Sequence, residues 1–477
     1  MKKVEMGAGR RKLLSLRLLL LLLIEAPLAH AQALPHRQLL RDIYKELIEI
    51  NTTDSVGDTT QAAQAMAAGL QAAGFSSEDA KVLVHPGNAR KGNLVARLRG
   101  SGVRRPLLLL AHLDVVEARQ EDWSEGLDPF KLTERDGYFY GRGAIDDKAM
   151  AAIFVANLIR YKQEGFKPDR DIILALTADE EGGDFNGVDW LIKNHRRLVD
   201  AEFGINEGGG GRERKGKPLF NGVQASEKVY QSFRLEVKSP GGHSSLPSKD
   251  NAIYHLTGGL DRLASFDFPV NLNEVTRAYF QRMAAIEQGQ IAADMKAVAK
   301  APMDPAAVSR LSASPYYNAM MRTTCVATRL EAGHADNALP QTAQAVVNCR
   351  ILPQESAKEI YQTLRRVLAD DRIALSFIKE PKPSPPSPLK PEILRPVEAV
   401  TEMMWAGIPV IPIMGTGATD SLYFRQEGIP VYGVSGLFTE IDDNRSHGKD
   451  ERMGVKELYE GQEFLYRLVK AYASKSD

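Results

Sequence analysis

The chain has 477 residues, of which 43% are hydrophobic, and its 61 basic and 61 acidic side chains give a formal net charge of zero. This length exceeds one ordinary domain, and the apolar content is normal for a globular protein with a full core, so two domains are expected. No basic stripe stands out beyond the amino terminus, so nucleic acid is not expected as a partner.

The amino-terminal segment has the pattern of an export signal. Basic residues precede an apolar stretch from Leu13 to Ile24, and the small-residue site Ala29-His30-Ala31 follows. We expect residues 1–31 to be a signal peptide cut after Ala31, and the mature protein to be periplasmic or secreted. The apolar stretch is shorter than the roughly 20 residues of a spanning helix, so no stable membrane insertion is expected after cleavage. An uncleaved anchor is the lesser alternative.

The next part of the chain, to about residue 222, alternates helical and extended patterns. A helix is expected at Ala62–Ala73, a strand at Asn93–Leu98 and a helix at Ala149–Gln163, whose apolar residues recur at helical spacing. Two short apolar runs, Leu107–Ala111 and Ile172–Thr177, predict buried strands. This alternation is typical of an α/β domain, whose sites lie at the carboxyl ends of its strands.

Five candidate metal ligands stand in five separate motifs. Two cations a few Å apart require imidazole and carboxylate ligands, with one carboxylate shared, so that water between them becomes acidic. Each motif is weak by itself, and an acidic pair at a helix start would also explain Glu180 and Glu181. The ordered set favours a two-metal amide hydrolase, with the ligands His112, Asp146, one of the pair Glu180 and Glu181, Glu207 and His447.

A second unit is expected at residues 225–380. A strand in SFRLEVKS, a helix at Ala252–Ala264, a helical insertion to about Leu311, two strands, a helix at Ala357–Leu368 and a strand in IALSFIK follow one another. Without the insertion, this order is ferredoxin-like. Cys325 and Cys349 lie in the two middle strands and could face each other as a disulfide, although buried free thiols are an equal alternative.

The last part, residues 381–477, begins in the proline-rich EPKPSPPSPLKP, which fits a stiff connector back to the first domain. It contains His447 and ends in a helix expected at Val455–Ala473. The first domain would therefore comprise two segments, 32–224 and 381–477.

Further motifs carry a family resemblance: SPGGHSSLP, GHADNALP, NCRILP and GATDSLYFRQEGIPVYG. Together with the ligand motifs they make the chain, after its first forty or so residues, similar to the M20 metallopeptidases. Carboxypeptidase S-like and Gly-Xaa carboxypeptidase-like members look nearest. The resemblance implies an α/β dizinc-peptidase catalytic domain with a mixed central sheet, and an inserted ferredoxin-like α+β domain that acts as lid and dimerisation domain.

The resemblance also assigns roles to the ligands. Asp146 would bridge two Zn²⁺ ions per chain, His112 and Glu207 would complete one site, and Glu181 and His447 the other. Glu180 would be the general base that takes a proton from the bridging water and passes it to the leaving amine.

Other matched positions concern support and substrate. Asp114 would fix the His112 imidazole, and the Asp146–Asp147 peptide bond is a candidate for the cis form. His243 would reach the site of a partner subunit and stabilise the oxyanion, which requires a homodimer.

Three further matches would hold the substrate. Arg350 would grip its free carboxylate through the planar guanidinium, although it could equally be an ordinary exposed strand residue. The backbone near Gly417 would share that carboxylate, and Asn337 would also contact the substrate.

The expected function is hydrolysis of short peptides or N-acyl amino acids with a free carboxyl terminus, as in carboxypeptidases and aminoacylases. In the family, Glu rather than Asp at position 207 goes with these activities. A dipeptidase or aminopeptidase of the same family is the alternative, and a non-catalytic binding or scaffold module is the alternative from another class.

Overall fold

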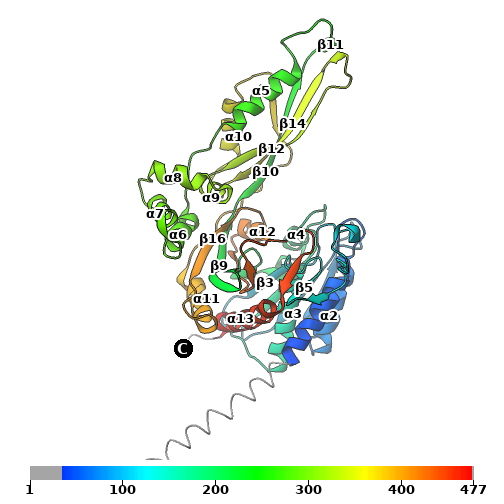
Figure 1. Cartoon of the computed structure of the whole chain (residues 1–477). Coiled ribbons are helices and arrows are strands. Elements are labelled where there is room, and N and C mark those ends of the chain that lie inside the picture. Colours follow the sequence, from blue (N-terminus) through cyan, green and yellow to red (C-terminus); the bar gives the residue numbers. More distant parts are fainter. Residues whose placement is uncertain (1–34, 475–477) are drawn as a thin grey trace, which may run out of the picture.

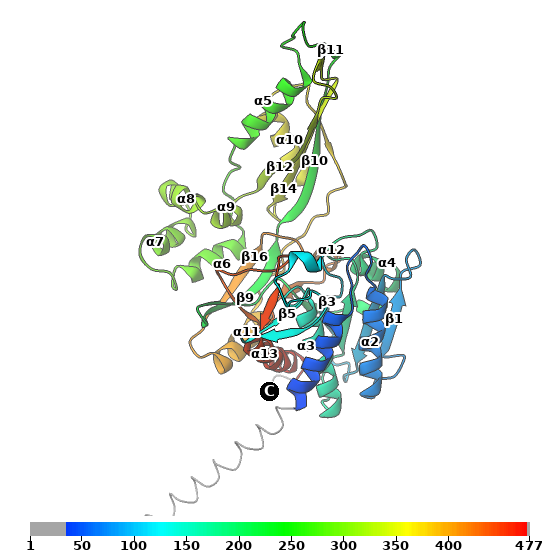
Figure 2. The same ribbon diagram turned by 45° about the vertical axis from the view of Figure 1, so that its right-hand side comes forward.

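The computed structural model describes residues 35–474 (Figure 1). The expected signal peptide lies outside them. Within the described residues, no helix combines the length and apolar character needed to cross a membrane. The two views in Figures 1 and 2 show two bodies, the second extending away from the first.

The first body is built on a ten-stranded sheet that combines parallel and antiparallel pairs, as the expected mixed sheet requires. Nine strands follow one path and β16 pairs with β9 beside it. In spatial order the strands are β1 (Ala80–Val84), β2 (Gly92–Leu98), β6 (Ile172–Thr177), β3 (Leu107–His112), β7 (Phe203–Asn206), β17 (Val431–Gly433), β9 (Lys217–Glu227), β8 (Gly211–Arg214) and β18 (Phe438–Glu440), with β16 at Val410–Gly415.

Helices cover both faces of this sheet, which explains why β3 and β6 are apolar along their whole length. Leu107 and Leu109 of β3 join the core under one set of helices, whereas Leu108 and Leu110 join a separate core on the other face. The first set includes α2 (Thr59–Ala72), α3 (Lys148–Gln163), α11 (Pro391–Met404) and α13 (Val455–Ala473); the second includes α4 (Gly187–Val199) and α12 (Ser421–Gln426).

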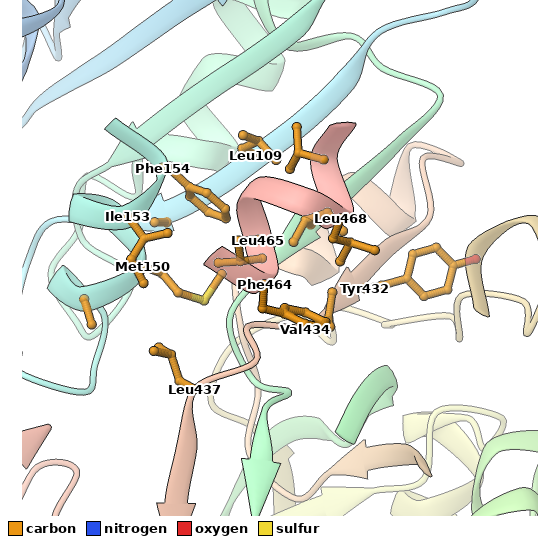
Figure 3. Close-up of a cluster of buried hydrophobic side chains, with 14 of the residues drawn as sticks. Leu109, Met150, Ile153, Phe154, Tyr432, Val434, Leu437, Phe464, Leu465 and Leu468 are labelled. Carbon is orange, nitrogen blue, oxygen red and sulfur yellow. The ribbon is translucent and has the colours of Figure 1, made fainter. Parts of the chain in front are cut away.

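Figure 3 shows part of the core on the side of α3 and α13, where Phe154 of α3 and Leu465 of α13 lie beside Leu109 of the sheet. A small three-stranded sheet, β4 (Thr133–Arg135), β5 (Tyr138–Tyr140) and β19 (Arg452–Gly454), joins the region before α3 to the segment before α13.

The second body is a four-stranded antiparallel sheet with two helices. The strand order β12-β14-β10-β15 and the chain order strand–helix–strand–strand–helix–strand are ferredoxin-like. Cys325 and Cys349 are paired across β12 and β14 and form a disulfide. The elements are β10 (Val229–Lys238), α5 (Ala252–Ala264), β12 (Thr324–Ala332), β14 (Thr342–Ile351), α10 (Ala357–Leu368) and β15 (Ala374–Phe377).

The helical insertion extends further than the sequence indicated, to Met321 rather than about Leu311. Its apolar residues join the core of the first body, not that of the ferredoxin-like sheet. Arg282 fixes it there by donating from Nη1 to the backbone oxygen of Val410, 2.6 Å away. The insertion comprises α6 (Glu274–Met283), α7 (Gly289–Val298), α8 (Pro305–Ser312) and α9 (Pro315–Met321).

Candidate dinuclear metal site

The five predicted ligands come together at one edge of the large sheet. His112 is the last residue of β3, Glu181 follows β6 and Glu207 follows β7. These three strands are parallel neighbours, so their carboxyl ends meet. Asp146 is contributed by the loop before α3, and His447 by the loop between β18 and β19.

The ligand atoms form two groups that share Asp146. His112 Nε2 lies 3.0 Å from Asp146 Oδ1 and 3.8 Å from Glu207 Oε1. His447 Nε2 lies 3.1 Å from Asp146 Oδ2 and 2.7 Å from Glu181 Oε1. Within each group one atom per residue lies within 4.8 Å of the others, and the imidazole and carboxylate ligands are those that zinc accepts.

The surroundings of these atoms fit cations. Glu181 Oε1 is buried and accepts no hydrogen bond from the described residues. The atom that it faces is His447 Nε2, which belongs to the same ligand group. Burial and the nearby charges of Asp146 and Glu180 raise the pKa of Glu207 well above its usual value. Bound divalent cations would relieve this repulsion, because they are the largest positive charges such a site can hold.

Asp114 supports the site in a different way from the one expected. The His112 Nδ1 lies 2.9 Å from the backbone oxygen of Asp114, whereas the Asp114 carboxylate is 3.7 Å away. That carboxylate instead accepts the backbone N–H groups of Glu180 at 3.1 Å and Glu181 at 2.9 Å. The carbonyl therefore orients the imidazole, and the carboxylate orients the turn that carries the acidic pair.

Glu180 stands outside both ligand groups, while its neighbour Glu181 belongs to one. Burial raises the pKa of Glu180 well above its usual value, and the charges of Asp420 and Asp114 add to the rise against the opposing charge of His112. A carboxylate with a raised pKa beside bound cations is suited to take up and release a proton.

Sequence reasoning missed Glu451, which follows His447 by four residues. Its buried carboxylate accepts the backbone N–H groups of Gly143, Ile145 and Asp146 at 2.8–3.2 Å and pairs with Arg142 Nη1 at 2.6 Å. Arg142 Nη2 also donates to the backbone oxygen of Gly448, 3.0 Å away. The ion pair of Glu451 and Arg142 thus joins the loop of Asp146 to the loop of His447. Its only sign in the sequence was the presence of charged residues beside both ligand motifs.

The peptide bond between Asp146 and Asp147 is cis, as expected. Beside the ligands lies a pocket of about 360 Å³, lined among others by Asp146, Glu207 and Gly417.

The glycine run after Glu207 forms one wall of this pocket. The run is packed against neighbouring segments. A Cβ on Gly209 would collide with the backbone oxygen of Gly433, and Gly208 has φ +92° against the side chain of Gln224. The close approach of these backbones, and the left-handed conformation at Gly208, require glycine.

Three predicted residues lie in the second body and none lines the pocket. His243 is in β11 (Gly242–His243), whose partner β13 (Ala338–Leu339) directly follows Asn337. Both views place β11 at the far end of the second body (Figures 1 and 2). Arg350 lies over the ring of Tyr230, with the guanidinium carbon 4.7 Å from its centroid. Within one chain, these residues are therefore not brought to the ligands.

A mixed α/β sheet with two ligand groups sharing an aspartate at its strand ends is the architecture of a metal-dependent hydrolase. Residues 108–471 match Peptidase family M20/M25/M40, and the chain belongs to this family. It is a metallopeptidase-type hydrolase.

Named relatives agree with this family. An N-fatty-acyl-amino acid synthase/hydrolase of Xenopus tropicalis is 30% identical over 394 residues, covering 76% of this chain and 72% of the relative. A probable carboxypeptidase S-like protein of Dictyostelium discoideum is 28% identical, covering 77% and 71%. Among solved structures, an M20 family metallo-carboxypeptidase of Sulfolobus solfataricus shares the fold with a TM-score of 0.65 at 17% identity, covering 91% of this chain and 99% of that one.

Proposed function

We propose that this protein is an exported dizinc hydrolase that cleaves the amide bond of short peptides or N-acyl amino acids with a free carboxyl terminus. The observation that carries the proposal is the pair of ligand groups sharing Asp146, with Glu180 beside them and a pocket that also contains Gly417. The names of the two relatives, a hydrolase of acylated amino acids and a probable carboxypeptidase, support this substrate class.

The chain's own residues would divide the chemistry as follows. Zinc ions, when bound, would make a water molecule acidic and polarise the amide carbonyl. Glu180 takes the proton from the attacking water and delivers it to the leaving nitrogen. Asp146 fixes the spacing of the two ligand groups, and the turn held by Asp114 keeps Glu180 directed at the reacting atoms. A substrate carboxylate binds Arg350 and the backbone near Gly417 after the second body closes.

The second body acts in this proposal as lid and dimerisation domain. Its tip carries His243 and Asn337 far from the ligands of its own chain, which supports a role in a partner's site. The disulfide between Cys325 and Cys349 supports export, because such bonds persist in oxidising compartments.

A panel of dipeptides and N-acyl amino acids, free or blocked at either end, tests the substrate class in the presence of zinc. A buried charge-assisted contact is worth roughly 1.5–3 kcal/mol, so blocking the carboxyl terminus should lower kcat/KM at least about tenfold. Blocking the amino terminus should matter less. If amino-terminal blocking stops hydrolysis and carboxyl-terminal blocking does not, the carboxypeptidase or aminoacylase activity is excluded and an aminopeptidase-like activity replaces it.

A further inference from the structure

Arg212 is a charged residue of the pocket to which no role has been given. It lies in β8, five residues after Glu207, and lines the same pocket as the ligands Asp146 and Glu207. Gly208–Gly211 separate Glu207 from Arg212, so this part of the pocket wall is formed by backbone without side chains.

The guanidinium of Arg212 has unused hydrogen-bonding capacity. Its Nη1 donates to Thr439 Oγ1 at 2.7 Å, across the β8–β18 pairing, and this is its one side-chain hydrogen bond within residues 35–474. Arginine carries five N–H donors in a planar arrangement that matches a carboxylate.

The charge of Arg212 is also unmatched inside the pocket. None of the four acidic residues that line the pocket forms an ion pair with it in the described part of the chain; these are Asp146, Asp147, Glu207 and Asp443. Asp146 and Glu207 are metal ligands in the proposed function, and Asp147 is buried. Asp443 is already paired with Arg445 at 2.8 Å and Arg452 at 2.6 Å.

Apolar side chains complete the pocket. Met150 of α3 and Leu437, which directly precedes β18, both line the pocket and belong to the large core (Figure 3). Met453 adds a third apolar contact. A ligand group that suits this combination has a short hydrocarbon stem ending in a negative charge.

We propose that Arg212 is a specificity-determining residue that binds the side-chain carboxylate of an acidic residue, glutamate before aspartate, in the amino acid released by hydrolysis. This inference rests on the proposed function, in which Arg350 and Gly417 hold the α-carboxylate. Arg212 then holds a second carboxylate from the catalytic body itself.

The test compares glycyl and N-acetyl derivatives of glutamate, glutamine and leucine, with zinc-loaded full-length protein. Glutamine has the shape of glutamate without its charge. The wild type should prefer glutamate to glutamine in kcat/KM by on the order of tenfold or more, the usual effect of one charge-assisted contact. Arg212→Gln should remove this preference by slowing the glutamate substrates and leaving the others nearly unchanged.

Two further variants control for structure. Arg212→Lys retains the charge and should retain part of the preference. Arg214→Gln changes an exposed arginine on the same strand, outside the pocket, and should behave as the wild type. The inference would be overturned, with the proposed function still standing, if the wild type showed no preference for glutamate. It would also be overturned if Arg212→Gln lowered kcat/KM equally for all substrates. No hydrolysis of any substrate by the wild type would overturn both.

Discussion

Glu180 and Glu181 are adjacent in the sequence but lie in different surroundings. Both backbone N–H groups donate to the carboxylate of Asp114, which fixes the turn after β6. Glu181 faces His447, whereas Glu180 is near Asp420 and outside the ligand groups. In the proposed function, this arrangement separates metal binding by Glu181 from proton transfer by Glu180.

Replacing Glu180 with Gln should therefore leave the metal content near two per chain while kcat falls by a factor on the order of 10²–10⁴, the usual contribution of a positioned general base. Metal analysis of the purified variant and steady-state kinetics measure the two effects separately. Asp184→Asn changes an exposed acid in the same loop and should alter neither. Loss of zinc from Glu180→Gln would show that the roles of Glu180 and Glu181 are reversed.

At the scale of elements, His255 connects helix α5 to the segment after α10. Its Nδ1 lies 2.6 Å from Asp370 Oδ2 and its Nε2 lies 3.1 Å from Asp250 Oδ1, while Arg372 also pairs with Asp250. The hydrogen bond with Asp370 is the main cause that raises the pKa of His255 above its usual 6.5. The same contacts lower the pKa of Asp250, and that of Asp370 is lowered despite its partial burial.

A raised histidine pKa means that the folded state holds this proton more tightly than the unfolded state. The stabilisation is complete below about pH 6.5 and is lost as pH rises through the raised pKa. The aspartates set the lower limit, because their contribution is lost as pH falls below about 4. Hence His255→Gln should lower the unfolding temperature most near about pH 5.5 and least near about pH 9.

Thermal unfolding of the full chain at these two pH values measures the difference. His334→Gln, which changes an exposed histidine of the same body, is the matched control and should show no such dependence. An equal effect of His255→Gln at both pH values would mean that the histidine contributes through packing and not through its charge.

At the scale of the whole molecule, the ligands and the proposed oxyanion residue lie in different bodies. The ligands lie at the edge of the large sheet, and His243 is exposed on β11 at the far tip of the second body (Figures 1 and 2). Its Nδ1 contacts Ser245 Oγ at 2.7 Å, so in this arrangement the imidazole is held locally. A partner subunit would bring such a tip to another chain's site.

Mixing two inactive variants tests this sharing. A Glu180→Ala chain lacks the base but retains His243, and a His243→Ala chain lacks the imidazole but retains the base. In a mixed dimer one of the two sites contains both groups, so activity should return to a measurable fraction of that of the wild type. Each variant mixed with itself is the control, and no recovery in verified mixed dimers would contradict a shared site.

Local patterns were sufficient for much of the fold. The helices Ala252–Ala264, Ala357–Leu368 and Val455–Ala473 have the bounds that the sequence indicated, because each carries an apolar stripe at helical spacing. The end of the insertion was placed too early. Its last helix, Pro315–Met321, is only seven residues long, and such a short segment has too few turns to show a period.

The sequence by itself determined the α/β pattern, the family and the set of residues able to bind two metals, because these depend on residue type and on spacing along one chain. Tertiary structure decided how the set is held. Asp114 supports the acidic turn, Glu451 and Arg142 join two ligand loops from about 300 residues apart, and Arg212 lines the pocket without an ion pair among residues 35–474. Such contacts arise only when distant segments pack, so no local pattern encodes them.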